Sequence, residues 1–127
     1  AVSDLDGSEV SSSEIKALTE RLRSELLMTK HFKVLERDIM EEILKEQGFQ
    51  QSGCTTSECV VQIGQLVNVE KMVAGTINKI GNTFFSSVRI IDITTGSIDK
   101  IVSFDYTGPI DELLKRGMKK IAIELTL

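Results

Sequence analysis

The sequence lacks the side-chain patterns on which single-stranded nucleic-acid binding and membrane-spanning helices depend. Its 127 residues include no tryptophan, one tyrosine and five phenylalanines, and no stripe interleaves basic with aromatic residues. Single-stranded nucleic acid binds where bases stack on aromatic side chains in a basic groove, so we expect no nucleic-acid partner. No apolar run approaches the ~20 residues of a membrane-spanning helix. Membrane contact is therefore expected only through a lipid anchor upstream of Ala1.

Histidine and cysteine are also scarce. His31 is the only histidine and lies in a different segment from the two cysteines, Cys54 and Cys59, so a zinc site lacks ligands. Nothing in the chain has the spacing of a glycine loop that cradles phosphate between a strand and a helix. We therefore expect no catalytic residue, no metal and no cofactor, and predict that the protein is not an enzyme.

The two cysteines leave two interpretations open. Cys54 and Cys59 are separated by four residues around a predicted helix start, whereas a redox motif normally separates its cysteines by two. A disulfide would join the loop to the first helical turn and, in the chain-entropy model, stabilise the fold by about 2 kcal/mol. Such a bond would place the domain outside the reducing cytosol. The alternative is a pair of unbonded thiols.

Asp4 and Asp6 give the sharpest enzymatic alternative. The run Asp4-x-Asp6-Gly7 resembles the first motif of haloacid-dehalogenase-type phosphatases. In those enzymes one aspartate is the nucleophile, the next is the acid/base, and magnesium holds the phosphoryl group. The lysine motif and the acidic pair expected further along such a chain are missing. We therefore interpret the run as a strand end followed by an Asp-Gly turn.

Length and charge indicate one globular domain, residues 1–127. Hydrophobic residues make up 41% of the chain, glycines are scattered, and the single proline marks no linker. The net charge is −4, with both signs mixed along the sequence. The densest basic cluster, which we interpret as the solvated face of a helix, is Lys115, Arg116, Lys119 and Lys120.

Four helices are predicted from capping residues and apolar periodicity. Capping boxes indicate helix starts at Ser11, Asp38 and Thr55, and Pro109 suits the first turn of a last helix. The first helix is expected to end near Lys30, and Gly48 is placed to end the second. Apolar residues recur every three or four positions in each, as an amphipathic helix requires.

Strands are predicted from alternation and turn residues. Short strands are expected at residues 1–5 and 32–35, and longer ones at 72–77, 83–93 and 98–106. Gly81-Asn82 and Thr95-Gly96 are tight turns that make the last three strands an antiparallel meander. The fold class is therefore α/β, with α+β character. Helices pack against a mixed sheet in the order β-α-β-α-α-β-β-β-α.

Several runs of residues, taken in chain order, resemble one family. Residues 32–37 (FKVLER), 43–47 (ILKEQ) and 51–53 (QSG) resemble the "f-x-V-x-x-R … il-x-E-q … sG" run of CsgG-like envelope proteins. Cys54, Cys59 and residues 63–66 (IGQL) resemble the helix that follows it. Residues 72–77 (MVAGTI) and 88–96 (VRIIDITTG) resemble the family's next two strands. The resemblance spans nearly the whole chain.

This resemblance implies the α/β domain shared by the curli secretion channel lipoprotein, the amino-terminal domain of TolB and the penicillin-binding-protein activator lipoproteins. Such a domain is a non-catalytic protein–protein interaction or assembly domain of a bacterial cell-envelope lipoprotein. The implied location is periplasmic or outer-membrane associated. The implied partners are other envelope proteins or further copies of the chain.

Two alternatives remain beside that expectation. One is the magnesium-dependent phosphatase built on Asp4 and Asp6, and the other is a subunit of a curli-type secretion complex. Pore-forming members insert long amphipathic hairpins, whereas Gly81-Asn82 closes this hairpin tightly, so secretion-pore activity is not expected. The half-polar face of the sheet and the loop at residues 47–53 are the candidate partner surfaces.

Overall fold

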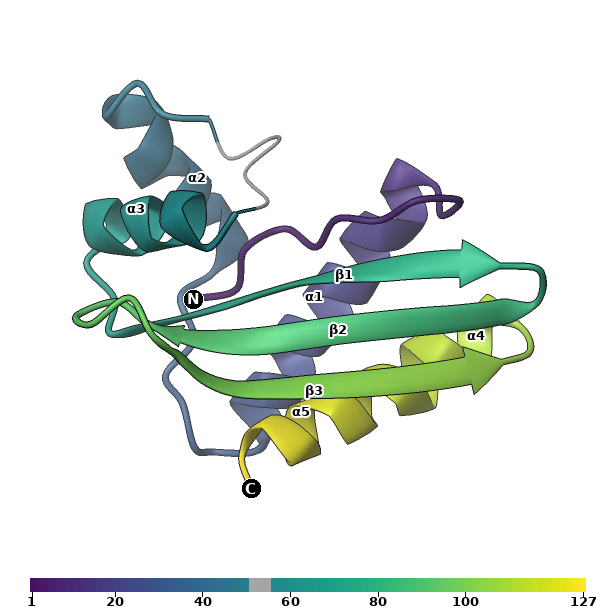
Figure 1. Ribbon diagram of the computed structural model, residues 1–127. Coiled ribbons are helices and arrows are strands. Elements are labelled where there is room, and N and C mark those ends of the chain that lie inside the picture. Colours follow the sequence, from purple (N-terminus) through teal and green to yellow (C-terminus); the bar gives the residue numbers. More distant parts are fainter. Residues whose placement is uncertain (51–55) are drawn as a thin grey trace.

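The computed structural model describes residues 1–50 and 56–127, with helices packed around a three-stranded antiparallel sheet (Figure 1). The strands β1(Lys71–Ile80), β2(Thr83–Asp92) and β3(Ile98–Thr107) are consecutive in the chain and adjacent in the sheet. The helices are α1(Ser12–Met28), α2(Arg37–Glu46), α3(Ser57–Val67), α4(Ile110–Glu112), the π-helical turn η1(Leu113–Gly117) and α5(Met118–Leu125). The predicted fold class is confirmed.

The first hairpin forms where the sequence predicts it. Ile80 pairs directly with Thr83, and Gly81-Asn82 is the two-residue turn between them. Of these two turn residues only Gly81 has a positive φ, 58°, which is the pattern of a type II′ turn. In the second hairpin the register shifts between Ile90 and Ile91, so β3 contains a local irregularity near its start.

Helix capping agrees with prediction for α1 and differs by a residue or two elsewhere. Ser11 Oγ accepts from the Glu14 backbone N–H at 3.2 Å, and Glu14 Oε1 accepts from the Ser11 N–H at 3.1 Å, which completes the capping box. The side chain of Thr56 caps α3, one residue later than expected. The second helix already begins at Arg37, after Glu36, whose side chain makes no capping bond.

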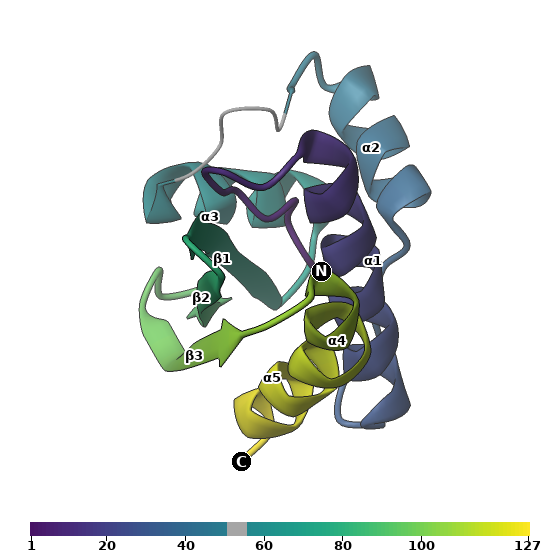
Figure 2. The same cartoon turned by 90° about the vertical axis from the view of Figure 1, so that its right-hand side faces the viewer.

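One face of the sheet is covered by α1 and by the helical segment η1–α5 (Figure 2). Alternate residues of each strand point to this face, so the strands contribute Val73, Ile77, Val88 and Val102. The helices contribute Leu18, Leu22, Leu26, Leu113, Met118 and Ile121. Each of these side chains is almost fully buried, which stabilises the fold by roughly 1.5–3 kcal/mol per large aliphatic residue.

The opposite face is covered at one end only, by α3 backed by α2. The second apolar cluster joins Met72, Ala74 and Ile91 of the sheet to Val60 and Ile63 of α3 and to Met40 and Leu44 of α2. Gly64 permits this contact, because a Cβ there would lie 2.5 Å from Ile93 Cδ1. Beyond this cluster, among the described residues, the face carries no helix (Figure 1).

The N-terminal segment runs parallel to β1 along its outer edge. Ser3 N–H donates to Val73 O at 2.8 Å, and Ile77 N–H donates to Asp6 O at 2.8 Å. The strand predicted at residues 1–5 is thus reduced to two isolated bridges, Val2 with Val73 and Asp6 with Thr76. Parallel pairing here and antiparallel pairing elsewhere give the sheet its mixed character.

The short strand predicted at residues 32–35 is not formed as a strand. These residues are an irregular connection between α1 and α2. The outer edge of β1 pairs with residues 1–8. Phe32 and Val34 instead pack against the first apolar cluster, which accounts for the apolar alternation that suggested a strand.

The last helix follows Pro109, as predicted, but contains a π-helical turn. Gly117 lies at the end of η1, and a Cβ there would lie 2.7 Å from Leu113 Cδ1 and 3.1 Å from Phe104 Cε1. The wider turn and the missing side chain bring the helix close to β3. No helix in the described ranges is long and apolar enough to span a bilayer.

Gly75→Ala tests the close approach of β1 and β2. A Cβ at Gly75 would lie 2.3 Å from Ser87 O and 2.9 Å from Val88 Cα, both backbone atoms. We expect the substitution to lower the free energy of unfolding by roughly 1–3 kcal/mol, as overpacking does, measured by urea denaturation. The control is Ser87→Ala on the exposed side of β2. We expect it to change the free energy of unfolding by less than about 0.5 kcal/mol.

Candidate interaction surfaces

The open face of the sheet carries apolar side chains among polar ones. Beyond α3 its exposed positions alternate along β2 and β3, because the residues between them point to the core. Phe85 is 37% exposed and Ile101 is 55% exposed, and at the hairpin end Ile80 is 72% exposed. Their polar neighbours are Ser87, Arg89, Ser103 and Asp105. This is the half-polar face predicted from the alternation of β3.

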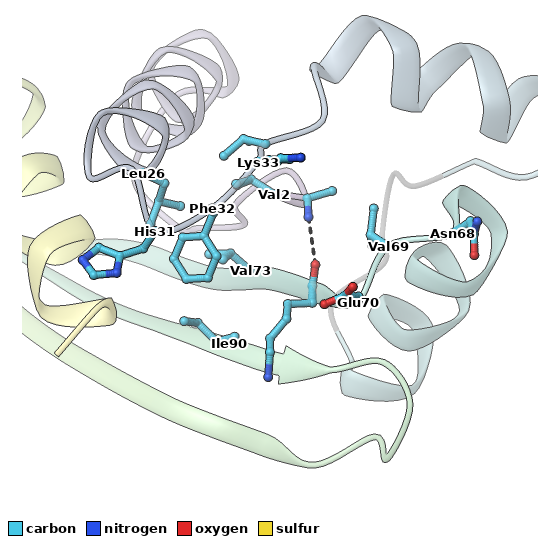
Figure 3. A pocket seen from close by; sticks show the side chains of 13 residues that line it. Val2, Leu26, His31, Phe32, Lys33, Asn68, Val69, Glu70, Val73 and Ile90 are labelled. Carbon is cyan, nitrogen blue, oxygen red and sulfur yellow. Dashed lines mark hydrogen bonds between the residues drawn. The ribbon is translucent and has the colours of Figure 1, made fainter.

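A hollow of about 390 Å³ lies where α1 ends beside the start of β1 (Figure 3). Its walls are largely aliphatic, with Leu26, Val73 and Ile90 around the ring of Phe32, which lies near the centre of the view. Lys33, Glu70 and Lys71 bring charges of both signs to its rim. His31 also lines the hollow, but the described lining includes no serine, cysteine or second histidine.

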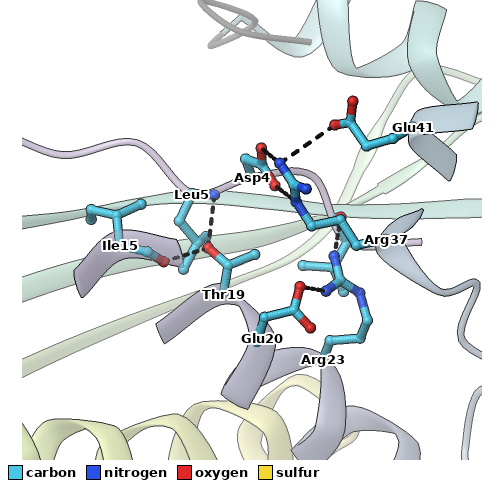
Figure 4. Close-up of polar contacts among 9 residues, drawn as sticks. Asp4, Leu5, Ile15, Thr19, Glu20, Arg23, Arg37 and Glu41 are labelled. Atoms are coloured by element: carbon cyan, nitrogen blue, oxygen red, sulfur yellow. Dashed lines mark hydrogen bonds and ion pairs between the residues drawn. The ribbon is translucent and has the colours of Figure 1, made fainter. Parts of the chain in front are cut away.

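A polar cluster fastens the N-terminal segment to α1 and α2 (Figure 4). Arg37 Nε and Nη2 donate to the two carboxylate oxygens of Asp4, each at 2.9 Å, and Arg37 Nη2 lies 3.5 Å from Glu41 Oε1. The hydrogen bonds and charge of Asp4 raise the pKa of Arg37. Arg23 Nη2 donates to Val2 O at 3.1 Å. This cluster places residues 1–6 along β1.

The hydroxyl of Thr19 also holds the N-terminal segment against α1. Thr19 Oγ1 accepts from the Leu5 N–H at 3.2 Å and donates to Ile15 O at 2.8 Å (Figure 4). Thr19 is 1% exposed, so both bonds replace water contacts inside the fold. The interactions join the segment to α1.

The structure places Asp4 in a supporting position. Both of its carboxylate oxygens accept hydrogen bonds from Arg37, so the nucleophile that the phosphatase alternative needs is held by a guanidinium. Asp6 follows on the same segment and is exposed. Within residues 1–50 and 56–127, no three histidine, cysteine or carboxylate side chains gather into a group that could hold a metal ion. Nothing in this geometry favours the phosphatase alternative.

Two further candidates involve residues outside the described ranges. The predicted Cys54–Cys59 disulfide includes Cys54, and the predicted loop surface at residues 47–53 includes residues 51–53. Cys59 itself lies in the first turn of α3, where its backbone N–H donates to Thr56 Oγ1 at 3.2 Å. The disulfide therefore stays a prediction.

A double-mutant cycle measures the Asp4–Arg37 pair. Asp4→Ala, Arg37→Ala and the double variant are expected to give a coupling free energy of about 1 kcal/mol, because the pair is bidentate and half-buried. The measurement is urea denaturation of all four proteins. The matched control is the Glu112–Arg116 pair, whose arginine is 86% exposed. Its coupling should be below about 0.5 kcal/mol. Equal couplings would contradict the anchoring role of Arg37.

Thiol titration tests the disulfide. Protein isolated from an oxidising compartment should show no reactive thiol in denaturant before reduction and two after it. Removing the bond by Cys54→Ser with Cys59→Ser should lower the free energy of unfolding by roughly 2 kcal/mol, since the closed loop is short. Two thiols reactive without reductant would favour the alternative of unbonded cysteines.

Solved structures share this fold at low sequence identity. The LpoB C-terminal domain from Escherichia coli is 16% identical, with a TM-score of 0.71 over 84% of this chain and 80% of that one. Lipoprotein GNA1162 from Neisseria meningitidis is 12% identical, with a TM-score of 0.69 over 98% and 91%. The PelC dodecamer from Paraburkholderia phytofirmans is 10% identical, with a TM-score of 0.58 over 98% and 81%.

Sequence comparison supplies the family. No curated protein matches the chain. The model of the family described as curli production assembly/transport component CsgG matches residues 2–87, from the N-terminal segment through β1 and into β2. Because this match covers more than half of the sequence, and the predicted resemblance is thereby confirmed, the chain belongs to the CsgG family.

Proposed function

We propose that this chain is a non-catalytic protein–protein interaction and assembly domain of a bacterial cell-envelope lipoprotein. The observation that carries the proposal is the open face of the sheet. Phe85 and Ile101 are exposed there on a rigid strand pair, and no described helix covers them. Exposed apolar side chains on a fixed scaffold, with polar neighbours, are typical of a surface that binds another protein.

Family membership supports the same function. The family description names production, assembly and transport of curli, which are tasks of proteins that work with other proteins. The buried hydroxyl of Thr19 and the half-buried Asp4–Arg37 pair both hold the N-terminal segment in place. These observations favour binding over catalysis.

We place the protein in the bacterial envelope, periplasmic or associated with the outer membrane. One structural neighbour is named a lipoprotein, and the curli description concerns assembly and transport. On this proposal the domain itself binds protein, and a lipid anchor upstream of Ala1 holds it at the membrane. The Cys54–Cys59 disulfide would suit the same oxidising compartment.

The partners are other envelope proteins or further copies of the chain. PelC, whose fold is similar, is named as a dodecamer, so self-association is an available mode for this architecture. A ring subunit of a curli-type complex is the more specific form of that mode. Light scattering separates the two, because a ring keeps its mass on dilution whereas a hetero-partner domain is monomeric alone.

Site-specific photo-crosslinking in the bacterium tests the proposed function. A benzoylphenylalanine at Ser87 or at Ser103 lies on the open face, at residues that are exposed. We expect either position to form an adduct with one envelope protein or with a second copy, identified by mass spectrometry. Phe85→Arg in the same protein should abolish the adduct, because a charge on a buried apolar contact costs several kcal/mol.

The control places the same probe at Ser24, an exposed serine of α1, the helix that covers the opposite face of the sheet. We expect no adduct there. Adducts of equal yield at Ser87, Ser103 and Ser24 would mean random collision and would contradict the proposal. So would a folded protein that gives none at any position.

A further inference from the structure

The outer edge of β3 is unpaired in the described part of the chain and presents a row of backbone N–H and C=O groups. β3 is ten residues long, contains no proline, and ends the sheet order β1-β2-β3. The opposite edge of the sheet is occupied, because residues 1–8 pair with β1. Among the described residues no segment pairs with β3 on its outer side. A long edge of this kind can take up a strand from another chain.

Hairpin geometry defines which backbone groups face outward. In a two-residue hairpin the residues beside the turn, Ile80 and Thr83, exchange hydrogen bonds, and such pairs recur at every second position. Odd-numbered residues of β2 therefore bond to β1 and even-numbered ones to β3. The even-numbered residues of β3 pair with those of β2 and hydrogen-bond to them. The backbone N–H and C=O groups that point outward therefore belong to residues 99, 101, 103, 105 and 107. All five are exposed.

A groove of about 390 Å³ runs beside this edge, between β3 and the helical segment η1–α5. Phe104 and Tyr106 form its aromatic floor, since both point to the helix-covered face of β3. Gly117 has no side chain, so the end of η1 lies close to Phe104 of β3 at this point. A strand added to β3 would direct every second side chain into the groove.

The wall of the groove is cationic. Arg116 and Lys120 line it, one helical turn apart, and Lys120 Nζ lies 5.4 Å from the centre of the Phe104 ring. Glu112 Oε2 lies 3.1 Å from Arg116 Nε, but the Arg116 side chain is 86% exposed, so this pair is weak and open to exchange. Lys115 and Lys119, exposed on the same helical segment, add to the positive potential.

We propose that the edge of β3 binds an extended, acidic segment of a partner protein, which adds a fourth strand and places alternate carboxylates in the groove beside Lys120 and Arg116. The inference rests on the proposed function, because it names where and what an interaction domain would bind. Backbone pairing supplies the affinity, and the groove supplies the selectivity for acidic side chains.

A second copy of this chain fits the groove poorly. The side chains that β3 itself would offer to the groove of a neighbour are Lys100, Val102, Phe104 and Tyr106. None of them is acidic, and Lys100 would meet the cationic wall. Charge complementarity therefore favours a different protein as the source of the strand.

Binding of synthetic peptides tests the inference on the intact chain. The probe is a fluorescein-labelled decapeptide that alternates glutamate with valine and threonine. Controls are the same peptide with lysine for glutamate, and the acidic peptide with N-methyl groups on one backbone edge. By fluorescence anisotropy we expect the acidic peptide to bind at least about 10-fold more tightly than either control. Its binding should slow amide exchange at residues 101, 103 and 105.

Two charge reversals on neighbouring residues locate the peptide. Lys120→Glu places a carboxylate in the groove and should weaken binding of the acidic peptide by about 10-fold, whereas Lys119→Glu has the same net charge outside the groove and should weaken it less than about 3-fold. Both side chains are exposed, so both variants are expected to fold. Ser103→Pro, which removes one outward N–H, should also weaken binding.

Several results would overturn the inference. These are equal binding of the acidic and basic peptides, undiminished binding of the N-methylated peptide, and equal effects of Lys119→Glu and Lys120→Glu. Self-association by light scattering that Ser103→Pro abolishes would assign the edge to a second copy instead. If the peptides fail while the probe at Ser87 still crosslinks to a partner, the inference is wrong and the proposed function stands.

Discussion

Burial of one sheet face against α1 and η1–α5 is the constraint on which the rest of the structure depends. Most even-numbered residues of β2 and β3, such as Val88 and Val102, are apolar and must leave water, and the two amphipathic helices supply the matching surface. On the other face, the buried apolar residues of the described ranges gather around Met72 and Ile91, and the second helical pair, α2 and α3, covers that end. An open, half-polar face is the direct consequence.

The two edges of the sheet differ because an extended N-terminal segment pairs with β1, whereas no described segment pairs with the outer side of β3. Residues 1–8 pair with β1, and Thr19, Arg23 and Arg37 hold them there from two helices. The segment hydrogen-bonds the backbone of β1 that would otherwise be exposed, which protects this edge from unwanted pairing. Among the described residues nothing covers the edge of β3 in this way. The fold thus protects the edge of β1 with several interactions and leaves the edge of β3 unpaired. This difference favours the edge of β3 as the one that binds a partner strand.

Local signals in the sequence predicted local structure well. The Ser11–Glu14 capping box, the Gly81-Asn82 turn and the alternation of β3 each depend on residues within a few positions of one another, and each is present. The family resemblance was also predicted from ordered short runs and is confirmed.

Features that depend on distant residues were missed. Asp4 binds Arg37, 33 residues away, and no local pattern distinguishes such an aspartate from a catalytic one. The parallel pairing of residues 1–8 with β1, across some seventy positions, also has no local signal. Residues 32–35 have strand-like side chains but form no strand, and Phe32 and Val34 pack against the first apolar cluster instead. The π-helical turn and the close approach of Gly117 to Phe104 on β3 also have no signal in the sequence spacing.

Net charge and local charge act in opposite directions on an acidic partner. The chain carries −4 overall, so at distances beyond the Debye length of about 8 Å at physiological salt it does not attract acidic protein. Within that distance two cations, Arg116 and Lys120, line the groove beside β3 together with one carboxylate, Glu112, so the lining carries a local excess of positive charge. Long-range electrostatic attraction therefore does not bring an acidic partner to the protein. The partner is recognised only at short range, at the edge of β3. Such an arrangement contributes to specificity and register more than to association rate.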